Sequence, residues 1–142
     1  MADMVPVTIT GVVSGPSDTP ERGERFFIVL TESGGNGDSP GRRMEIAVGD
    51  AEAMALSHRL QSYAFPRPMT YQFMASLVSA AGSAVRQVRV TGKRDGIHYA
   101  QVMLRGGATV DARPSDALNL AAVTGAPVVV APELLDRPAL TS

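Results

Sequence analysis

Carboxylates and an arginine stand at the two places where a strand-like pattern in this sequence changes into a helical one. Glu52 follows the first change, and three further charged residues surround the second. Hydrolysis of a phosphodiester needs an activated water, neutralisation of the phosphate charge and a stabilised leaving oxygen, all of which such side chains can supply. The candidate catalytic residues are therefore Glu52, Asp111, Arg113 and Asp116.

Two roles are open for these residues. If the two strand-to-helix units pack about a pseudo-twofold axis, the acids could converge, and Glu52 and Asp116 could hold one divalent cation such as Mg²⁺ or Mn²⁺. Acids in the first turn of a helix are also favoured by the helix dipole and the free N–H groups alone. Arg113 could grip a phosphate with two N–H groups or tie a neighbouring acid in a structural ion pair. A divalent cation at this pair is a hypothesis, and no other cofactor is predicted.

Basic residues at two further places could bind a sugar-phosphate backbone. Arg67 lies between Pro66 and Pro68, which fix the local backbone and lower the entropic cost of presenting the side chain. Four cations fall within nine residues of a predicted strand and turn: Arg86, Arg89, Lys93 and Arg94. We predict that these five cations contact substrate, although charged hairpins also serve solubility and protect edge strands.

The histidines and the absence of cysteine narrow the chemistry. His58 falls one helical turn after Met54 and is interpreted as a helix residue. His98 lies in a strand pattern beside Tyr99 and is interpreted as a packing residue. A chain without cysteine has no disulfide, thiolate metal site or cysteine nucleophile. No Ser-His-Asp grouping is legible, so catalysis through a serine nucleophile is not predicted.

The apolar pattern of the first half predicts three strands and a helix. The strands are expected at Val5–Val13, Arg25–Thr31 and Met44–Val48. The helix is expected at Asp50–Gln61 and carries Ala53, Leu56 and Leu60 at helical spacing. Glycine-rich and proline-rich segments at 14–23 and 33–41 are predicted turns.

The second half predicts two more helices and further strands. Thr70 is the expected N-cap of a helix with Phe73, Met74 and Leu77 among its apolar residues, and Gly82 ends it. Asp95-Gly96 is a strong turn signal, so the strands on either side should pair antiparallel. The remaining elements are strands at Val85–Val90, Ile97–Leu104, Ala108–Ala112 and Pro127–Ala131, a helix from Pro114 to Gly125, and a final helical turn at Pro132–Leu135.

A possible internal sequence repeat indicates how these elements are organised. Met44–Leu56 and Ala108–Leu120 align without gaps as a strand, a tight turn and a helix whose third residue is acidic, Glu52 in one and Asp116 in the other. Short helices rich in alanine and leucine also resemble each other by chance. The sequence thus predicts an α+β fold with a mixed, largely antiparallel sheet and three main helices, and a duplicated βββα unit is a hypothesis.

Length and composition place the chain among ordinary globular proteins. Its 142 residues, 44% hydrophobic and 19% charged, predict a single domain over residues 1–136 with a polar tail at 137–142. No signal sequence or membrane span is legible, so we expect a cytoplasmic protein without a membrane partner. The net charge of −1 neither favours nor excludes nucleic acid as a partner.

Four separate blocks of this sequence resemble the bifunctional nuclease domain in order and spacing. They are Gly49–Leu56, Pro66–Thr70, Asp95–Ala100 and Asp111–Ala117, the last followed by Thr124–Pro127. The most specific is Asp-Ala-Arg-Pro-Ser-Asp-Ala, and the resemblance spans about 44–136. It implies a bacterial-type protein with an α+β fold, self-association, for which a dimer is favoured, and the DNase and RNase activity reported for some members.

Two departures from the family pattern bear on activity. After Pro-Arg-Pro-x-Thr the family usually carries His-Asp, whereas this chain has Tyr71-Gln72. The family's Pro-Ile-Trp-Ile-Gly before the first helix is replaced by Met44–Gly49. Two functions are therefore open for this chain. The first, which we favour, is a nuclease that hydrolyses RNA or DNA phosphodiesters, and the second is a non-catalytic oligomeric module that binds a small anion, a nucleotide or a protein.

Overall fold

The computed structural model describes residues 3–16, 24–34 and 41–135. Its strands are β1 (Val5–Pro16), β2 (Glu24–Glu32), β3 (Arg43–Val48), β4 (Val85–Arg94), β5 (Ile97–Leu104), β6 (Thr109–Ala112) and β7 (Val128–Val130). Its helices are α1 (Asp50–Leu60), α2 (Thr70–Ala80), α3 (Pro114–Thr124) and the short 3-10 helix η2 (Pro132–Leu134). Residues 17–23 and 35–40 of the predicted turns, and the predicted tail at 137–142, lie outside the described residues.

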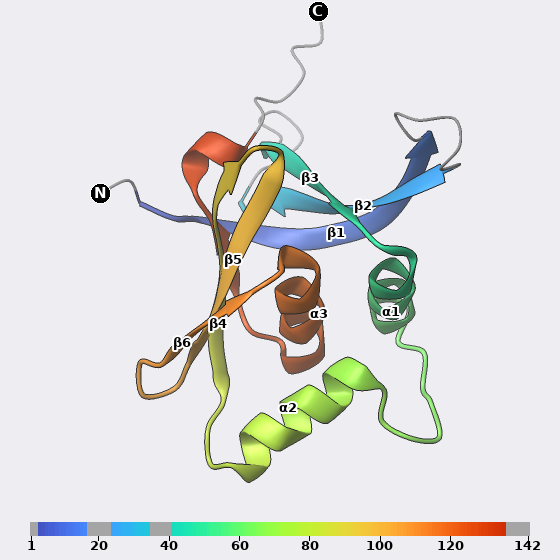
Figure 1. Ribbon diagram of the computed structural model, residues 1–142, viewed down its shortest axis with the longest axis vertical. Coiled ribbons are helices and arrows are strands. Elements are labelled where there is room, and N and C mark those ends of the chain that lie inside the picture. Colours follow the sequence, from blue (N-terminus) through green and yellow to red (C-terminus); the bar gives the residue numbers. More distant parts are fainter. Residues whose placement is uncertain (1–2, 17–23, 35–40, 136–142) are drawn as a thin grey trace, which may run out of the picture.

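The strands form one mixed sheet in the order β3-β2-β1-β7-β4-β5-β6. Only β4 and β7 pair in parallel, and the other neighbouring pairs are antiparallel. Figure 1 shows that the sheet curls, because β1, β2 and β3 cross the top of the view while β4, β5 and β6 run down one side. The predicted α+β class, with a largely antiparallel mixed sheet and three helices, is confirmed.

The element order repeats as β-β-β-α on either side of α2. The first unit ends in α1 and the second in α3, and β7 inserts between β1 and β4 to join the two halves of the sheet. Each residue of β7 is buried, which its unbroken Val-Val-Val sequence favours. The predicted βββα order is therefore present twice in the structure.

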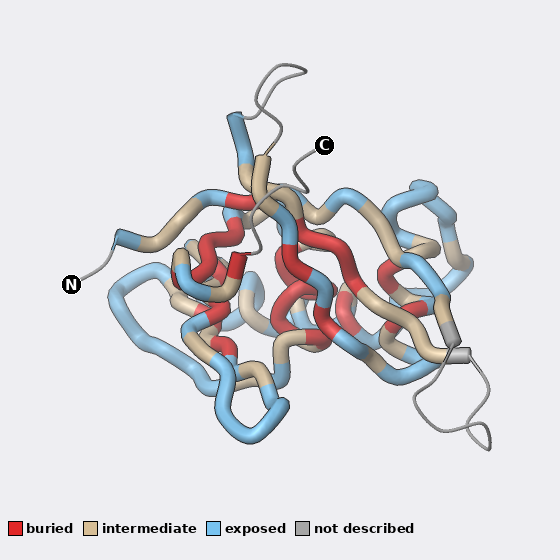
Figure 2. Tube along the Cα trace, turned by 90° about the horizontal axis from the view of Figure 1, so that it is seen from above, coloured by how far each residue is buried: buried red, intermediate tan, exposed pale blue. Residues whose placement is uncertain are grey.

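The core lies in the hollow of the curled sheet, where α1 and α3 pack against the strands and against each other. Figure 2 shows the buried segments gathered in the middle of the molecule. The fully buried side chains come from both units, among them Ile28, Leu30, Leu56, Val88, Val90 and Leu118. The starts of α1 and α3 are thus anchored side by side.

Local signals placed several boundaries correctly. Asp95 and Gly96 have φ angles of 52° and 79°, as the predicted tight turn requires, and the strands they join pair antiparallel. Gly125 caps α3 in the left-handed conformation, with φ 77°. Leu60, at the end of α1, is 42% exposed rather than part of the core.

The helix α2 differs from its prediction in two ways. Its N-cap is Met69, in an extended conformation, and Thr70 is the first helical residue, so the predicted threonine cap is wrong. Of its residues only Tyr71 is buried, while Phe73 and Leu77 are 55% and 54% exposed. The physical reason is that α2 packs on α3 rather than on the sheet, as Figure 1 shows.

The helices are too short for a membrane span. Each of the three α-helices has 11 residues, whereas crossing a bilayer takes about 20. In the described part of the chain no helix has the length and apolar character of a transmembrane segment.

Candidate functional site

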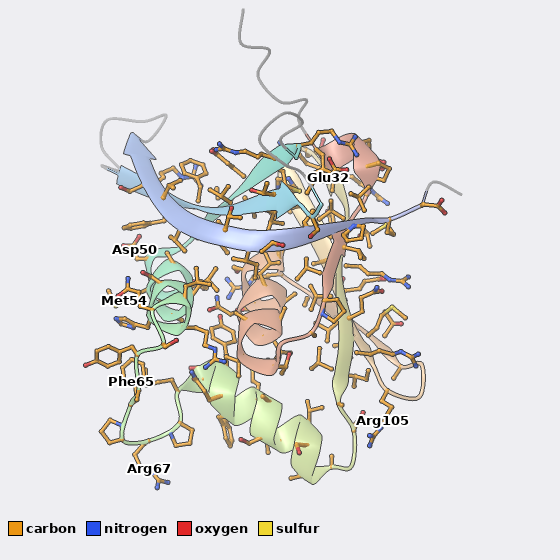
Figure 3. The ribbon with its side chains drawn as sticks, turned by 180° about the vertical axis from the view of Figure 1, so that it is seen from behind. Glu32, Asp50, Met54, Phe65, Arg67 and Arg105 are labelled. Carbon is orange, nitrogen blue, oxygen red and sulfur yellow. The ribbon has the colours of Figure 1, made fainter. Side chains whose placement is uncertain are left out.

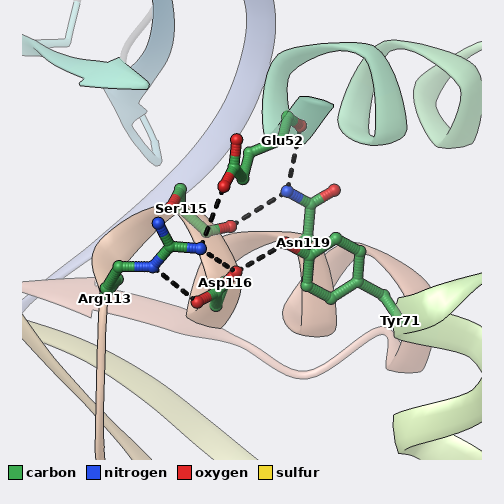
Figure 4. Close-up of polar contacts among 6 residues, drawn as sticks. All are labelled: Glu52, Tyr71, Arg113, Ser115, Asp116 and Asn119. Atoms are coloured by element: carbon green, nitrogen blue, oxygen red, sulfur yellow. Dashed lines mark hydrogen bonds and ion pairs between the residues drawn. The ribbon is translucent and has the colours of Figure 1, made fainter. Parts of the chain in front are cut away.

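The first turns of α1 and α3 bring two acids to one arginine. Glu52 is the third residue of α1 and Asp116 the third residue of α3, the equivalent positions of the repeated unit. Arg113 is the N-cap of α3, in an extended conformation that directs the following proline into the first helical position. Because α1 and α3 pack with their first turns together, the Arg113 guanidinium lies between the carboxylates of Glu52 and Asp116 (Figure 4).

Three of the five N–H bonds of the Arg113 guanidinium are accounted for by short contacts. Its Nε donates to Oδ2 of Asp116 at 2.8 Å, and its Nη2 donates to Oε1 of Glu52 at 2.9 Å and to Oδ1 of Asp116 at 3.1 Å. Nη1 makes no hydrogen bond to the described residues. Two carboxylates thus fix the guanidinium plane and leave one amino group for a ligand.

Exposure differs sharply across this cluster. The side chain of Arg113 is 66% exposed, whereas those of Glu52 and Asp116 are 18% and 30% exposed. Hydrogen bonds to Asp116 and then to Glu52 raise the pKa of the Arg113 guanidinium above its ordinary value. The arginine is therefore a permanent cation that faces solvent. The two carboxylates that hold it lie deeper in the protein.

Asp116 is held as a carboxylate by its donors. Burial alone would raise the pKa of this carboxyl, but hydrogen bonds from Arg113 and Tyr71 outweigh burial, and the pKa lies below its ordinary value. Both carboxylate oxygens already accept hydrogen bonds. A carboxylate with a lowered pKa and occupied lone pairs is a weak proton acceptor, so Asp116 serves the cluster by charge and position.

Tyr71, in the first turn of α2, completes the cluster from a third helix. Its hydroxyl donates to Oδ1 of Asp116 at 2.6 Å, and its ring is 8% exposed. Burial raises the pKa of the Tyr71 hydroxyl above its ordinary value, and the bond to Asp116 raises it further. Tyr71 therefore remains a neutral donor. It anchors α2 to α3 and does not act as a base.

Asn119 is a structural member of this site that the sequence analysis missed. Its Nδ2 donates to the backbone carbonyl of Ser115 at 2.9 Å and across to that of Glu52 at 3.1 Å, and the residue is 1% exposed. The amide thereby locks the first turn of α1 to α3. A usable signal existed, since Asn119 is a polar residue within an apolar helical run, Ala-Leu-Asn-Leu-Ala-Ala.

The cluster opens into a cavity of about 370 Å³. Glu52, Arg113 and Asp116 line one side, and His58, Phe65 and Met69 are among the residues of the other. His58, interpreted from sequence as an ordinary helix residue, therefore faces the same cavity as the charged cluster. It lies three residues after Ala55 and seven after Ala51, on the α1 face that also presents these two alanines to this cavity.

A second and larger cleft, of about 880 Å³, lies on the other side of Arg113. Asp111 lines this cleft and not the first, so the structure does not bring it to the Glu52–Asp116 pair. Lys93, Arg25 and His98 line the same cleft, and burial and the nearby Lys93 lower the pKa of His98. His98 is half-buried and borders a cleft.

The predicted substrate-binding cations do not form one patch. Arg67 lines a separate hollow beside the first cavity. Arg94 lies over the ring of Tyr99, with its guanidinium carbon 5.7 Å from the ring centre, while Nε of Arg89 donates to Gln87 at 2.7 Å. Arg86 and Arg89 line neither of the two clefts that Arg113 borders.

The donor set does not fit a resident divalent cation. The Arg113 guanidinium occupies the space between the Glu52 and Asp116 carboxylates, where a bridging cation would bind. Within residues 3–16, 24–34 and 41–135 no three histidine or acidic side chains gather closely enough to hold a metal ion.

Comparison with known proteins gives this site a context. A family model described as the bifunctional nuclease domain matches residues 28–142. An uncharacterized protein found in two strains of Mycobacterium tuberculosis is 30% identical over 135 residues, which cover 94% of this chain and 76% of that protein. Bifunctional nuclease 1 of Arabidopsis thaliana is 32% identical over 99 residues, which cover 66% of this chain and 30% of that protein.

Proposed function

This chain belongs to the bifunctional nuclease domain family, and from that premise we propose that it hydrolyses phosphodiester bonds of RNA or DNA at the cavity beside Arg113. One observation carries the proposal. An exposed guanidinium is held rigidly by two carboxylates at the mouth of a cavity and retains an amino group for a ligand. Such a group suits the two non-bridging oxygens of a phosphate diester.

The chemistry uses Glu52 as the base. Its carboxylate contacts Arg113 through Oε1 and lines the cavity, so it lies within reach of a water next to a phosphate bound by the arginine. Glu52 takes a proton from that water as the water oxygen bonds to phosphorus. The bond from phosphorus to the leaving sugar oxygen breaks, and that oxygen takes a proton from solvent. Arg113 neutralises the charge that develops on the phosphate.

A specific observation favours a second function. Tyr71 stands where the family usually has a histidine, and its hydroxyl is a bound donor with a raised pKa. The first position of the family's His-Asp pair therefore has no base in this chain. The second function is an anion-binding module that keeps the Arg113 cavity without turnover, for a nucleotide or the backbone of a nucleic acid.

A cleavage assay distinguishes these functions. Purified protein is incubated with labelled RNA and DNA in the presence of Mg²⁺, Mn²⁺ or EDTA, which also reveals whether a cation accompanies the substrate. Arg113→Lys keeps the charge but removes the planar fork, and we expect it to slow cleavage roughly 10- to 1000-fold. The separate variant Glu52→Gln should lose most of the parent protein's cleavage activity.

The matched control is Arg43→Lys, the same change at an exposed arginine in an ion pair with Glu45 at 3.7 Å, at the far end of β3. Its activity should equal that of the parent protein. If the folded parent protein cleaves neither RNA nor DNA under any of these conditions but binds them through Arg113, the nuclease proposal is wrong and the anion-binding module replaces it.

We also propose that the protein self-associates, with a dimer as the simplest form, through α2. The helix contains no charged residue, and Phe73, Met74 and Leu77 are exposed on it. Two copies can meet on such a face without bringing like charges together, and the meeting would bury apolar surface that is otherwise in water. A cytoplasmic location is a further proposal, and it rests on the sequence.

A further inference from the structure

An aromatic cluster stands at the end of α1, outside the core. The ring centres of His58 and Tyr63 are 5.2 Å apart, those of His58 and Phe65 are 5.3 Å apart, and those of Tyr63 and Phe65 are 4.7 Å apart. Tyr63 is 58% exposed. These three side chains therefore offer aromatic surface to solvent in a protein that has only 5% aromatic residues.

The backbone conformation at the end of α1 positions this aromatic cluster. Ser62 adopts a left-handed conformation, with φ 56°, and its N–H bonds to the carbonyl of Arg59 at 3.0 Å. The N–H of Tyr63 reaches back to the carbonyl of His58 at 2.9 Å. This pair of bonds is a Schellman motif, which brings the second residue after the helix against the last turn. Tyr63 thus packs on His58 because of how α1 ends.

The cluster separates two adjoining hollows. The first is the Arg113 cavity, which His58 and Phe65 line. The second, of about 280 Å³, is lined by Tyr63, Phe65, Arg59 and Arg67 among others. Phe65, Met69 and Gln72 line both hollows, so the two adjoin at these residues. Figure 3 shows Phe65 and Arg67 on the loop between α1 and α2, with Arg67 pointing outward.

Arginines stand at both ends of this path, and at one end Arg113 shares the lining with Glu52 and Asp116. The lining of the second hollow contains two arginines and no carboxylate. Arg59 is held in place because its Nε donates to the carbonyl of Ala122 at 3.1 Å. At the other end stands Arg113, with a free amino group facing solvent. Cations therefore lie on both sides of the aromatic cluster.

We propose that this path, which we call the strand track, binds single-stranded nucleic acid. The track runs from Arg113 across His58, Phe65 and Tyr63 to Arg59 and Arg67. Phosphates pair with the arginines at its two ends, and an unpaired base stacks on the aromatic rings between them. Alternation of basic and aromatic groups is how proteins hold single strands without reading sequence. A base inside a duplex is already stacked on both faces and cannot bind there.

The strand track deepens the proposed function, because it gives the Arg113 site a substrate class. It also gives Arg67 a partner, namely a phosphate that follows the stacked base. The other four predicted cations, Arg86, Arg89, Lys93 and Arg94, line neither hollow of the track.

Fluorescence anisotropy measures this binding directly. The probes are a labelled 12-nucleotide single strand, the same strand with four central abasic sites, and the matching duplex, each checked for integrity after titration. Because stacking contributes about 1–3 kcal/mol per base, we expect Phe65→Leu and Tyr63→Leu each to weaken binding of the natural strand roughly 5- to 150-fold. Binding of the abasic strand should be unchanged.

Tyr99→Leu is the matched control for Tyr63→Leu, since it makes the same substitution at an exposed tyrosine outside both hollows. It should bind all three probes like the parent protein. Tyr63→Leu removes an exposed side chain, so it tests the track even if Phe65→Leu unfolds the loop. Equal binding of natural and abasic strands, or parent-like affinity in both folded variants, would overturn the proposal.

The two proposals fail in different ways. If the parent protein cleaves nucleic acid and neither aromatic variant changes its affinity for the single strand, the strand track is wrong while the nuclease stands. If the parent protein cleaves nothing but loses affinity for the single strand in Tyr63→Leu, the track stands and the nuclease is wrong. Loss of self-association in the aromatic variants, with unchanged affinity for the strand, would assign this surface to a second copy of the chain instead.

Discussion

Tyr71 stands where the family usually has a histidine, and its hydroxyl donates to the carboxylate of Asp116. The exchange removes a side chain that can take up a proton and replaces it with a neutral donor. The proton acceptor of the proposed reaction must then come from elsewhere in the cavity, and Glu52 is the carboxylate with fewer contacts. At the scale of single residues, the site depends on where the Glu52 carboxylate lies.

Gly49 offers a way to move that carboxylate without touching a charged residue. Its φ of −75° and ψ of 165° suit alanine, but a Cβ there would lie 2.6 Å from Oε2 of Glu52. The Glu52 carboxylate must then shift, because the backbone of α1 is fixed and the side chain is not. We predict that Gly49→Ala slows nucleic-acid cleavage roughly 10- to 100-fold.

Melting temperature and initial cleavage rate, measured together, check this prediction. The melting temperature should change little, because alanine suits the backbone at this position. Gly11→Ala is the control, since a Cβ at Gly11 meets nothing within 4 Å. A Gly49→Ala protein with the parent cleavage rate would show that the position of Glu52 does not matter to the reaction.

Among the elements, the contact between α1 and α3 positions the site. The two helices meet near their first turns, and Asn119 on α3 bonds to the backbone of Glu52 on α1. A buried amide without its partners is costly, so the bond favours one register of the two helices over others. The register in turn sets the distance between the two carboxylates that hold Arg113.

Replacing Asn119 tests this element contact. Asn119→Ala removes two hydrogen bonds from a residue that is 1% exposed and leaves a small cavity. We expect the free energy of unfolding to fall by about 2–4 kcal/mol, as measured by urea denaturation. Gln61→Ala removes an exposed amide whose Nε2 lies 3.2 Å from Ser57, and should cost no more than about 0.5 kcal/mol. Equal losses in the two variants would contradict the structural role of Asn119.

In the whole molecule, one side of α2 is apolar and exposed to water. The helix α2 packs on α3 and makes few contacts with the strands, so Phe73 and Leu77 keep more than half of their surface exposed. This is the face on which we propose that a second copy of the chain packs. Phe73 and Leu77 line neither hollow of the strand track, so this face is distinct from the track.

A charge on α2 tests self-association. We predict that Leu77→Glu converts the protein to a monomer, because a buried pair of like charges at a twofold interface is strongly unfavourable. Ile97→Glu is the matched control, an equally exposed apolar residue at 60% in the β4–β5 hairpin. Sedimentation velocity over a range of concentrations distinguishes the two variants. Parent and Leu77→Glu proteins of equal mass would place the interface elsewhere or show that there is none.

Local patterns in the sequence determined most of the elements. Asp95-Gly96 predicted the hairpin turn, and Pro114 and Gly125 predicted both ends of α3, because each of these residues restricts or permits a particular backbone conformation. The repeated βββα order was legible for the same reason, since apolar spacing reports the period of a strand or helix. The N-cap of α2 was missed by one residue, because the backbone at Met69 is already extended and needs no threonine.

Only the tertiary structure decided which charged residues meet. Arg113 reaches Glu52 across 61 positions of the chain, and Tyr71 reaches Asp116 across 45. Asp111, two residues before Arg113, faces a different cleft. Such pairings depend on how α1, α2 and α3 pack in the curled sheet, and no local periodicity encodes that packing. Composition and spacing thus supplied the candidate groups, while long-range contacts selected the cluster and left α2 exposed.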